Sequence, residues 1–250
     1  MRTPLVLTAT IHPRAVPHMV LRNPAERWRQ YRAALSFWLT RPGLREYVFC
    51  ENSGAAVDYQ PLLALAKAYG KTLELVLFDD NAAARRYGKG YGEGDLLARA
   101  WAHSALLAGA DGFYKVTGRL IVLNFDRIER VARRRPAVFA NRFLGQADWV
   151  DTRFFKVSAP LFRERLQDAH RSVTELGPPS RRWALGQAYA RALSGLSLPS
   201  FFPMPQYRGM SGYGLVYEDP AWKLWIKSGL CLAGAYRIGR AHARPDAPGP

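Results

Sequence analysis

The segments Tyr-Gly-Lys-Gly-Tyr-Gly-Glu-Gly (residues 87–94) and Phe-Tyr-Lys-Val-Thr-Gly-Arg (residues 113–119) are the most informative part of this chain. Four glycines alternate in the first segment, and glycine permits positive φ and close approach of another molecule to the backbone. We expect a flexible loop here, followed from Asp95 by a helix whose free N–H groups and positive dipole end face an anion. The second segment is an apolar strand ending in a cationic cluster. Together they predict a nucleotide-phosphate site.

Strand-like and helical patterns alternate outward from these segments. Asn-Pro-Ala-Glu at residues 23–26 is typical of a helix start, with Asn as the cap, Pro in the first position and Glu completing a capping box. Strands are expected at residues 5–11, 46–50, 73–78, 113–116, 137–140 and 150–157, further helices at 61–69, 95–107, 159–172, 180–193 and 222–232, and residues 120–123 either extend the strand before them or form the next. This order predicts an α/β fold with a Rossmann-like, mostly parallel sheet flanked by helices and a helical or irregular C-terminal extension.

No internal repeat or linker composition divides the chain, so we expect a single α/β domain over residues 1–240. The prolines between residues 198 and 207 predict an irregular segment, and residues 208–214 are a second glycine-dense loop. Residues 241–250 are expected to form a disordered tail.

The net charge of +16 favours a partner that carries phosphates: nucleic acid, an anionic membrane surface or a nucleotide-linked substrate. Only seven of the 36 basic residues are lysine, so genome composition is a competing explanation for the excess of arginine. Cys50 and Cys231 are too few for a disulfide framework, which indicates a reducing compartment. With no signal-peptide pattern and no apolar run near the ~20 residues of a membrane span, we expect a cytoplasmic protein, with peripheral contact to the inner face of the membrane left open.

The residues above resemble bacterial glycosyltransferases of surface-polysaccharide assembly. The similarity covers about residues 5–157, with a weaker match near residues 211–214, and it rests on four segments: Thr-Ala-Thr-Ile at 8–11, Glu-Asn-Ser-Gly at 51–54, Gly-Lys-Gly-Tyr-Gly-Glu at 88–93, and Tyr-Lys-Val-Thr-Gly-Arg at 114–119 followed by Asn124. The resemblance implies a GT-A-type fold and transfer of a sugar from a nucleotide-sugar donor to a glycan or lipid-linked acceptor. Residues 1–125 would then be the nucleotide-sugar-binding half and residues 126–240 the acceptor-side half.

The resemblance also assigns residues to the site. Donor-binding positions are Thr8, Thr10, Glu51, Asn52, Gly88, Lys89, Gly90, Tyr91, Gly92, Lys115, Thr117 and Gly118, and acceptor-side positions are Arg153, Ser211 and Gly212. GT-A enzymes usually carry an Asp-x-Asp metal motif where this chain has Thr-Gly-Arg at 117–119. We therefore expect metal-independent transfer, with Arg119 and Lys115 stabilising the leaving phosphate as fixed charges. A divalent metal, Mg²⁺ or Mn²⁺, is possible but disfavoured, and Asp79-Asp80 is the one rival metal site, for which two solvated acids are the more common explanation.

An inverting transfer needs a general base for the acceptor hydroxyl. Asp151 is the first candidate, with a salt bridge to Arg153 as the competing explanation. Glu93 is the second candidate, although it can also serve the dipole of the following helix.

Two other classes of function stay open. One is a basic, non-catalytic α/β domain that binds RNA or an anionic glycan through its arginines; we expect no specific nucleic-acid partner, because the polar residues gather at predicted strand ends. The other is a nucleotidyl- or phosphotransferase, which requires a carboxylate pair near Lys115 that the sequence does not show.

Overall fold

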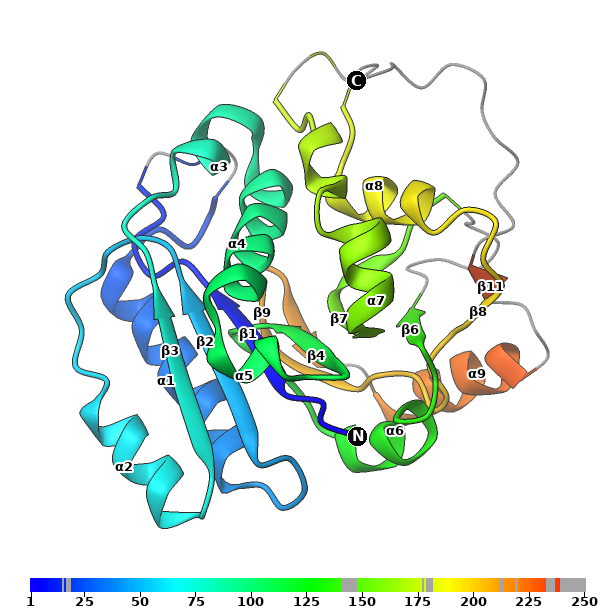
Figure 1. Cartoon of the computed structure of the whole chain (residues 1–250), viewed down its shortest axis with the longest axis horizontal. Helices are drawn as coiled ribbons and strands as arrows, with labels where there is room; N and C mark the ends of the chain where they lie inside the picture. Colours follow the sequence, from blue (N-terminus) through cyan, green and yellow to red (C-terminus); the bar gives the residue numbers. More distant parts are fainter. Residues whose placement is uncertain are drawn as a thin grey trace.

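A six-stranded sheet forms the centre of the protein (Figure 1), in the order β3-β2-β1-β4-β7-β6. The computed structural model describes residues 1–14, 16, 19–140, 148–176, 178, 182–211, 214–218, 220–232 and 237–238. The strands are β1 (Leu5–Ala9), β2 (Glu46–Glu51), β3 (Thr72–Leu77), β4 (Gly112–Thr117), β6 (Ala137–Ala140) and β7 (Asp151–Ser158). β1 to β4 are parallel, and β7 runs antiparallel to both of its neighbours. The mostly parallel sheet predicted from the sequence is confirmed.

Helices cover both faces of this sheet (Figure 1). One face packs against α1 (Pro24–Thr40), α2 (Gln60–Ala68) and α6 (Phe125–Ala132), and the other against α4 (Lys89–His103), α5 (Ala105–Ala108) and α8 (Leu185–Ala192). Successive side chains of a strand point to opposite faces, so Leu5 and Leu7 join the first layer while Val6 joins the second. The α/β fold thus follows from strands that are apolar on both sides.

The start of α1 has the predicted Asn cap but not the full capping box, because the Glu26 carboxylate accepts hydrogen bonds from Arg29 and Gln30 instead of the Asn23 N–H. Asn23 Oδ1 accepts a hydrogen bond from the Glu26 backbone N–H at 3.1 Å, and Pro24 occupies the first turn. Tyr31, Leu35 and Trp38 are buried on the helix face that meets the sheet.

The prediction of a flexible glycine loop is wrong. Of the four glycines in this segment only Gly88 has a positive φ, of 112°, and α4 already begins at Lys89, so Gly90, Gly92 and Gly94 lie inside the helix. All three are buried, because neighbouring segments approach the helix closely. A Cβ on Gly92 would lie 2.4 Å from the Cβ of Ala84 in α3 (Ala82–Tyr87), and one on Gly94 would lie 2.2 Å from the Cβ of His170. These glycines therefore allow neighbouring segments to pack closely against α4.

We expect Gly92→Ala to destabilise the protein by about 1–3 kcal/mol, because the added methyl group overpacks the contact with Ala84. Urea-induced unfolding measures the change. Gly229→Ala in α9 (Ala221–Leu232) is the matched control, since a Cβ there meets nothing within 4 Å. That substitution should leave stability unchanged or raise it by up to about 1 kcal/mol through helix propensity. Equal stabilisation by both alanines would show that the α3–α4 contact relaxes freely.

Of residues 120–123, the first three form a strand of their own. β5 (Leu120–Val122) pairs with β9 (Tyr207–Met210), which also pairs with β10 (Val216–Glu218). The expected glycine-dense loop at 208–214 is therefore partly strand. Its Gly209 has a φ of 130°, and a Cβ there would lie 2.4 Å from the Arg119 backbone oxygen, so glycine allows β9 to approach β5 closely.

The single helix expected at residues 159–172 is also wrong. The segment is a short helix α7 (Ala159–Leu161), a π-helical turn (Phe162–Leu166) and a 3₁₀ turn (Ala169–Ser172). In the C-terminal part, β8 (Leu198–Pro199) pairs with β11 (Arg237–Ile238), and the predicted helix near residues 222–232 is present as α9. None of the helices within the described ranges is long and apolar enough to cross a membrane. The predicted disordered tail at 241–250 lies outside the described residues.

Candidate functional site

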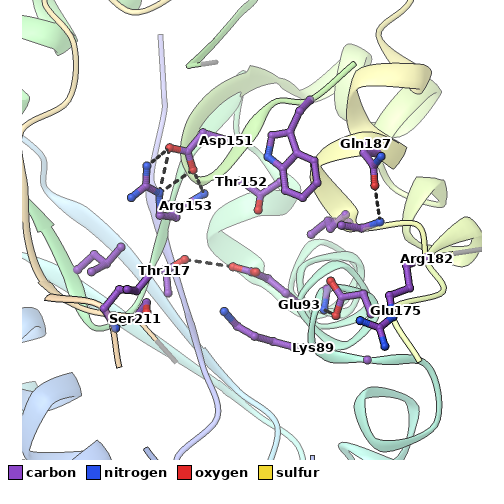
Figure 2. Close-up of a pocket in the computed structure, with 18 of the residues that line it drawn as sticks. Lys89, Glu93, Thr117, Asp151, Thr152, Arg153, Glu175, Arg182, Gln187 and Ser211 are labelled. Carbon is purple, nitrogen blue, oxygen red and sulfur yellow. Dashed lines mark hydrogen bonds and ion pairs between the residues drawn. The ribbon is translucent and has the colours of Figure 1, made fainter. Parts of the chain in front are cut away.

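Two adjoining cavities lie where β1 and β4 end, at the carboxyl edge of the parallel strands. The larger has a volume of about 610 Å³ and the smaller about 60 Å³, and Lys89, Glu93 and Thr117 line both. Open α/β sheets bind ligands at this edge. Figure 2 shows Lys89, Glu93 and Glu175 facing the larger cavity opposite Thr117 and the Asp151–Arg153 pair.

Lys115 and Glu93 form a buried ion pair beneath the cavity. Lys115, which is 1% exposed, bonds through Nζ to the Glu93 carboxylate and donates to Thr117 Oγ1 at 3.2 Å and to the Thr152 carbonyl at 2.6 Å. Thr117 Oγ1 donates in turn to Glu93 Oε1 at 3.1 Å. Burial alone would raise the pKa of Glu93, but the ammonium groups of Lys115 and Lys89 outweigh it and lower the pKa. Glu93 is thus held as an anion.

Glu175 is a second carboxylate in the same cavity, and sequence reasoning missed it. It follows the 3₁₀ turn and accepts a hydrogen bond from the Gly90 backbone N–H at 2.8 Å. Burial raises the pKa of Glu175, although this hydrogen bond and Lys89 act in the opposite direction. Two carboxyl groups whose environments push their pKa values apart are suited to different roles in acid–base chemistry. No periodic pattern or motif marks Glu175 in the sequence.

The smaller cavity brings together two buried arginines. Arg27 and Arg119 are 2% and 4% exposed, and both guanidinium groups lie against the Tyr31 ring, 5.7 and 5.6 Å from its centroid. Arg27 donates to the Thr10 carbonyl at 2.7 Å and to Tyr31 Oη at 3.1 Å. Burial would raise the pKa of Tyr31, but the two arginines outweigh it and lower the pKa.

The hydrogen bonding of Arg119 is incomplete. One of its terminal nitrogens donates to Gln30 Oε1 at 3.3 Å, whereas its buried Nε has no hydrogen-bond partner within the described part of the chain. A buried donor without an acceptor costs about 1–3 kcal/mol, which a bound anion would offset. Sequence reasoning selected Arg119 and missed Arg27. The signal for Arg27 was its place on the buried face of α1, where a charge is unexpected.

The predicted residues after β1 and β2 divide into two groups. Thr8, Thr10 and Asn52 line the smaller cavity, and Thr10 Oγ1 donates to Asn52 Oδ1 at 2.7 Å. Glu51 is 1% exposed and lines neither cavity. Its carboxylate accepts hydrogen bonds from the Ile11 N–H at 2.8 Å and the Ser53 N–H at 3.0 Å. Glu51 therefore stabilises the loops that follow β1 and β2, which contain Thr10 and Asn52.

Asp151 and Arg153 line the larger cavity as an ion pair. Arg153 Nε lies 2.9 and 3.0 Å from the two Asp151 carboxylate oxygens, and the guanidinium group contacts the rings of Tyr207 and Tyr217, 4.5 and 4.6 Å from their centroids. Burial would lower the pKa of Arg153, but Asp151 outweighs it and raises the pKa. The salt bridge that competed with a base role for Asp151 is present.

Some of the remaining predicted positions line a cavity and others do not. Gly88, Gly90 and Ser211 line the larger cavity and Gly92 the smaller one; Lys115, Tyr91 and Gly118 line neither. Tyr91 stacks on Tyr87 at 4.6 Å, and a Cβ on Gly118 would lie 2.7 Å from the Thr8 carbonyl oxygen. Gly212 lies outside the described residues.

The rival metal site is engaged by arginines. Asp79 pairs with Arg14 at 2.5 Å and Asp80 with Arg99 at 2.9 Å. In the part of the chain that the structure describes, no group of three or more His, Cys, Asp and Glu residues is placed to hold a metal ion.

No protein-family model and no curated protein matches the chain. Among solved structures, it is similar to the crystal structure of the nucleoside-diphosphate-sugar pyrophosphorylase from Vibrio cholerae RC9. The match covers 95% of this chain and 90% of that chain, with 10% sequence identity and a TM-score of 0.39. A likeness this distant supports no functional argument.

Proposed function

We propose that the protein is a glycosyltransferase that transfers a sugar from a nucleotide-sugar donor to a glycan or lipid-linked acceptor. The observation that carries the proposal is Arg119, buried beside Arg27 at the carboxyl edge of the sheet with an unsatisfied Nε. The smaller cavity suits a donor phosphate, which would supply the missing acceptor. The adjoining larger cavity has room for the sugar and the acceptor.

In such a transfer, the bond between the anomeric carbon and the donor phosphate oxygen breaks, and its electron pair stays on the phosphate. The acceptor oxygen bonds to the anomeric carbon, and the hydroxyl proton passes to a base. Arg119, Arg27 and Lys89 would stabilise the charge that develops on the leaving phosphate. Lys115 acts indirectly in this proposal, because it is held by Glu93 below the cavity floor. Fixed cations would thus replace a metal, which keeps the transfer metal-independent.

Glu175 is the best-placed general base. Its raised pKa makes it a better proton acceptor near neutral pH than an ionised, strongly stabilised carboxylate. Glu93 is held as an anion by Lys115, and both carboxylate oxygens of Asp151 accept from Arg153. The base roles predicted for Asp151 and Glu93 are therefore weaker hypotheses than the one for Glu175.

Nucleotidyl transfer is the second candidate. It is favoured by a pair of carboxylates in the larger cavity, Glu93, which is bonded to Lys115, and Glu175. This candidate makes a different product. In an enzyme of that class, an oxygen of a sugar 1-phosphate would attack the α-phosphorus of a nucleoside triphosphate, the bond between the α- and β-phosphates would break, and a nucleoside-diphosphate sugar and pyrophosphate would form. Pyrophosphate release from such a mixture would favour it over glycosyl transfer.

A thermal-shift screen tests the proposed function. We expect UDP-, GDP-, dTDP- or CMP-sugars of one nucleotide class to raise the melting temperature, in EDTA as well as with Mn²⁺. Arg119→Gln should abolish that shift, because the phosphate loses its buried donor. Arg41→Gln is the control, since Arg41 pairs with Asp126 outside both cavities.

Stabilisation only in the presence of Mn²⁺ would contradict metal independence. The absence of any shift, together with salt-sensitive binding of RNA, would favour the non-catalytic alternative.

A further inference from the structure

Helix α9 exposes its largest apolar side chains. Trp222, Trp225 and Ile226 are 61%, 75% and 57% exposed. Residues three and four apart share one side of a helix, so the three side chains form a single patch, which we call the α9 face. Isolated exposed apolar residues are normal on protein surfaces, but a contiguous group marks an interaction site.

The opposite side of α9 is fixed to the body of the protein. Leu224 is 9% exposed and belongs to the same core cluster as Ile128 of α6. Ser228 is 8% exposed, and its Oγ accepts a hydrogen bond from the Met204 backbone N–H at 3.1 Å. Figure 1 places the helix at the lower right edge of the molecule. The anchored inner side holds the α9 face outward.

The charge of α9 indicates what covers this face. The helix contains Lys223 and Lys227 and no acidic residue, in a chain whose net charge is +16. At about 100° per residue, both lysines fall between Ile226 and the buried Leu224, along one flank of the α9 face. Lys223 is exposed, and its Nζ lies 5.6 Å from the Trp222 ring centroid. Apolar side chains flanked by ammonium groups match the boundary between acyl chains and anionic headgroups.

We propose that the α9 face docks the protein onto an anionic lipid bilayer. The helix would lie in the plane of the interface, with the tryptophans at headgroup depth, where their rings are favoured, and the lysines on lipid phosphates. With 12 residues α9 is too short to span the ~20 residues of a bilayer core. The inference is independent of the proposed glycosyl transfer, because none of these side chains lines either cavity.

Co-sedimentation with lipid vesicles tests the proposal. We expect the full chain to bind vesicles of phosphatidylcholine that contain phosphatidylglycerol, with a blue shift of tryptophan fluorescence. The variant Trp222→Ser/Trp225→Ser/Ile226→Ser should bind more than about tenfold more weakly, because it loses the apolar area buried in the interface. These side chains are exposed, so the substitutions leave the core intact. Tyr69→Ser is the control, since Tyr69 is 53% exposed on another helix end.

The charge contribution has its own control. Lys223→Glu should weaken binding to the anionic vesicles about fivefold or more, following the ~1 kcal/mol that one lysine contributes near such a surface. Lys67→Glu makes the same charge change on an exposed site of α2 and should have little effect.

Three results would overturn the proposal: no vesicle binding by the unaltered chain, equal binding by the triple variant, or equal losses for Lys67→Glu and Lys223→Glu. A dimer that the triple substitution converts to a monomer, without vesicle binding, would assign the α9 face to a second copy of the chain instead.

Discussion

Replacing Glu175 with glutamine is expected to lower the rate of sugar transfer by about 10²–10⁴-fold, the contribution of a well-placed general base. Glutamine keeps the size of the side chain and can still accept from the Gly90 N–H through its carbonyl oxygen, but it cannot take a proton from the acceptor. Nucleotide-sugar binding should therefore persist, so that kcat falls while the thermal shift with the donor is kept.

The control for this prediction is Glu164→Gln, because Glu164 is exposed and outside both cavities. Asp151→Asn separates the two candidate bases. It should disturb transfer only through the looser position of Arg153. Near-normal turnover of Glu175→Gln together with complete loss in Asp151→Asn would return the role to Asp151.

The pH dependence of transfer has a definite sign. A base acts in its deprotonated form, and burial raises the pKa of Glu175 above its ordinary value of 4.5. The kcat/KM of the unaltered protein should thus rise with pH through this raised pKa, and Glu175→Gln should lose that rise. The effect on stability has the opposite sign. The folded protein binds this proton more readily than the unfolded chain does, so the contribution of Glu175 to the free energy of unfolding decreases as pH increases through the raised pKa.

Replacing Glu93 with glutamine is expected to cost about 3–5 kcal/mol of folding free energy, because it leaves the Lys115 ammonium group buried without its anion. Lys115 is 1% exposed and the Glu93 side chain 15%, so water does not compensate for the lost charge. Urea-induced unfolding at neutral pH measures the loss. The double variant Glu93→Gln/Lys115→Met should recover most of it, since removing both charges removes the uncompensated one.

The same pair predicts an acid-sensitive contribution. The pKa of Glu93 is lowered in the folded protein, so its stabilisation is complete above its unfolded pKa and is lost as pH falls through the folded value. Glu93→Gln should flatten this part of the stability curve. If Glu93→Gln left the pH dependence of stability unchanged and lowered the free energy of unfolding by less than about 1 kcal/mol, the usual range of an exposed ion pair, the pair would be open to solvent.

The order, along the chain, of the six strands of the central sheet was available from the sequence because it depends on local patterns. β1 and β2 are short apolar runs buried on both faces, and the cap at Asn23 needs only residues within the same turn. The polar residues after these strands could be placed at one edge because parallel strands end together. Thr8, Thr10 and Asn52 indeed line one cavity.

The glycine segment shows the limit of such reasoning. A flexible loop and a tightly packed helix both require residues without a Cβ, so the alternation at 88–94 is compatible with either. The choice depends on Ala84, His170 and Glu175, which approach α4 within 2.2–2.6 Å of the missing Cβ positions. Two of these three residues are more than 70 positions away in the chain, and no local pattern encodes that approach.

The charged residues of the site also divide into those that the sequence identified and those that only the folded structure revealed. The sequence alone indicated Lys115 and Arg119 as cations at a strand end, and Lys89 and Glu93 as charged residues of the glycine-rich segment. Tertiary structure paired Glu93 with Lys115, left Arg119 Nε without an acceptor, and added Arg27 and Glu175. Residue types and spacing follow from the chain, but burial and the distance between charges arise only when distant segments pack. Because desolvation and neighbouring charges set each pKa, the division of roles between Glu93 and Glu175 belongs to the folded protein alone.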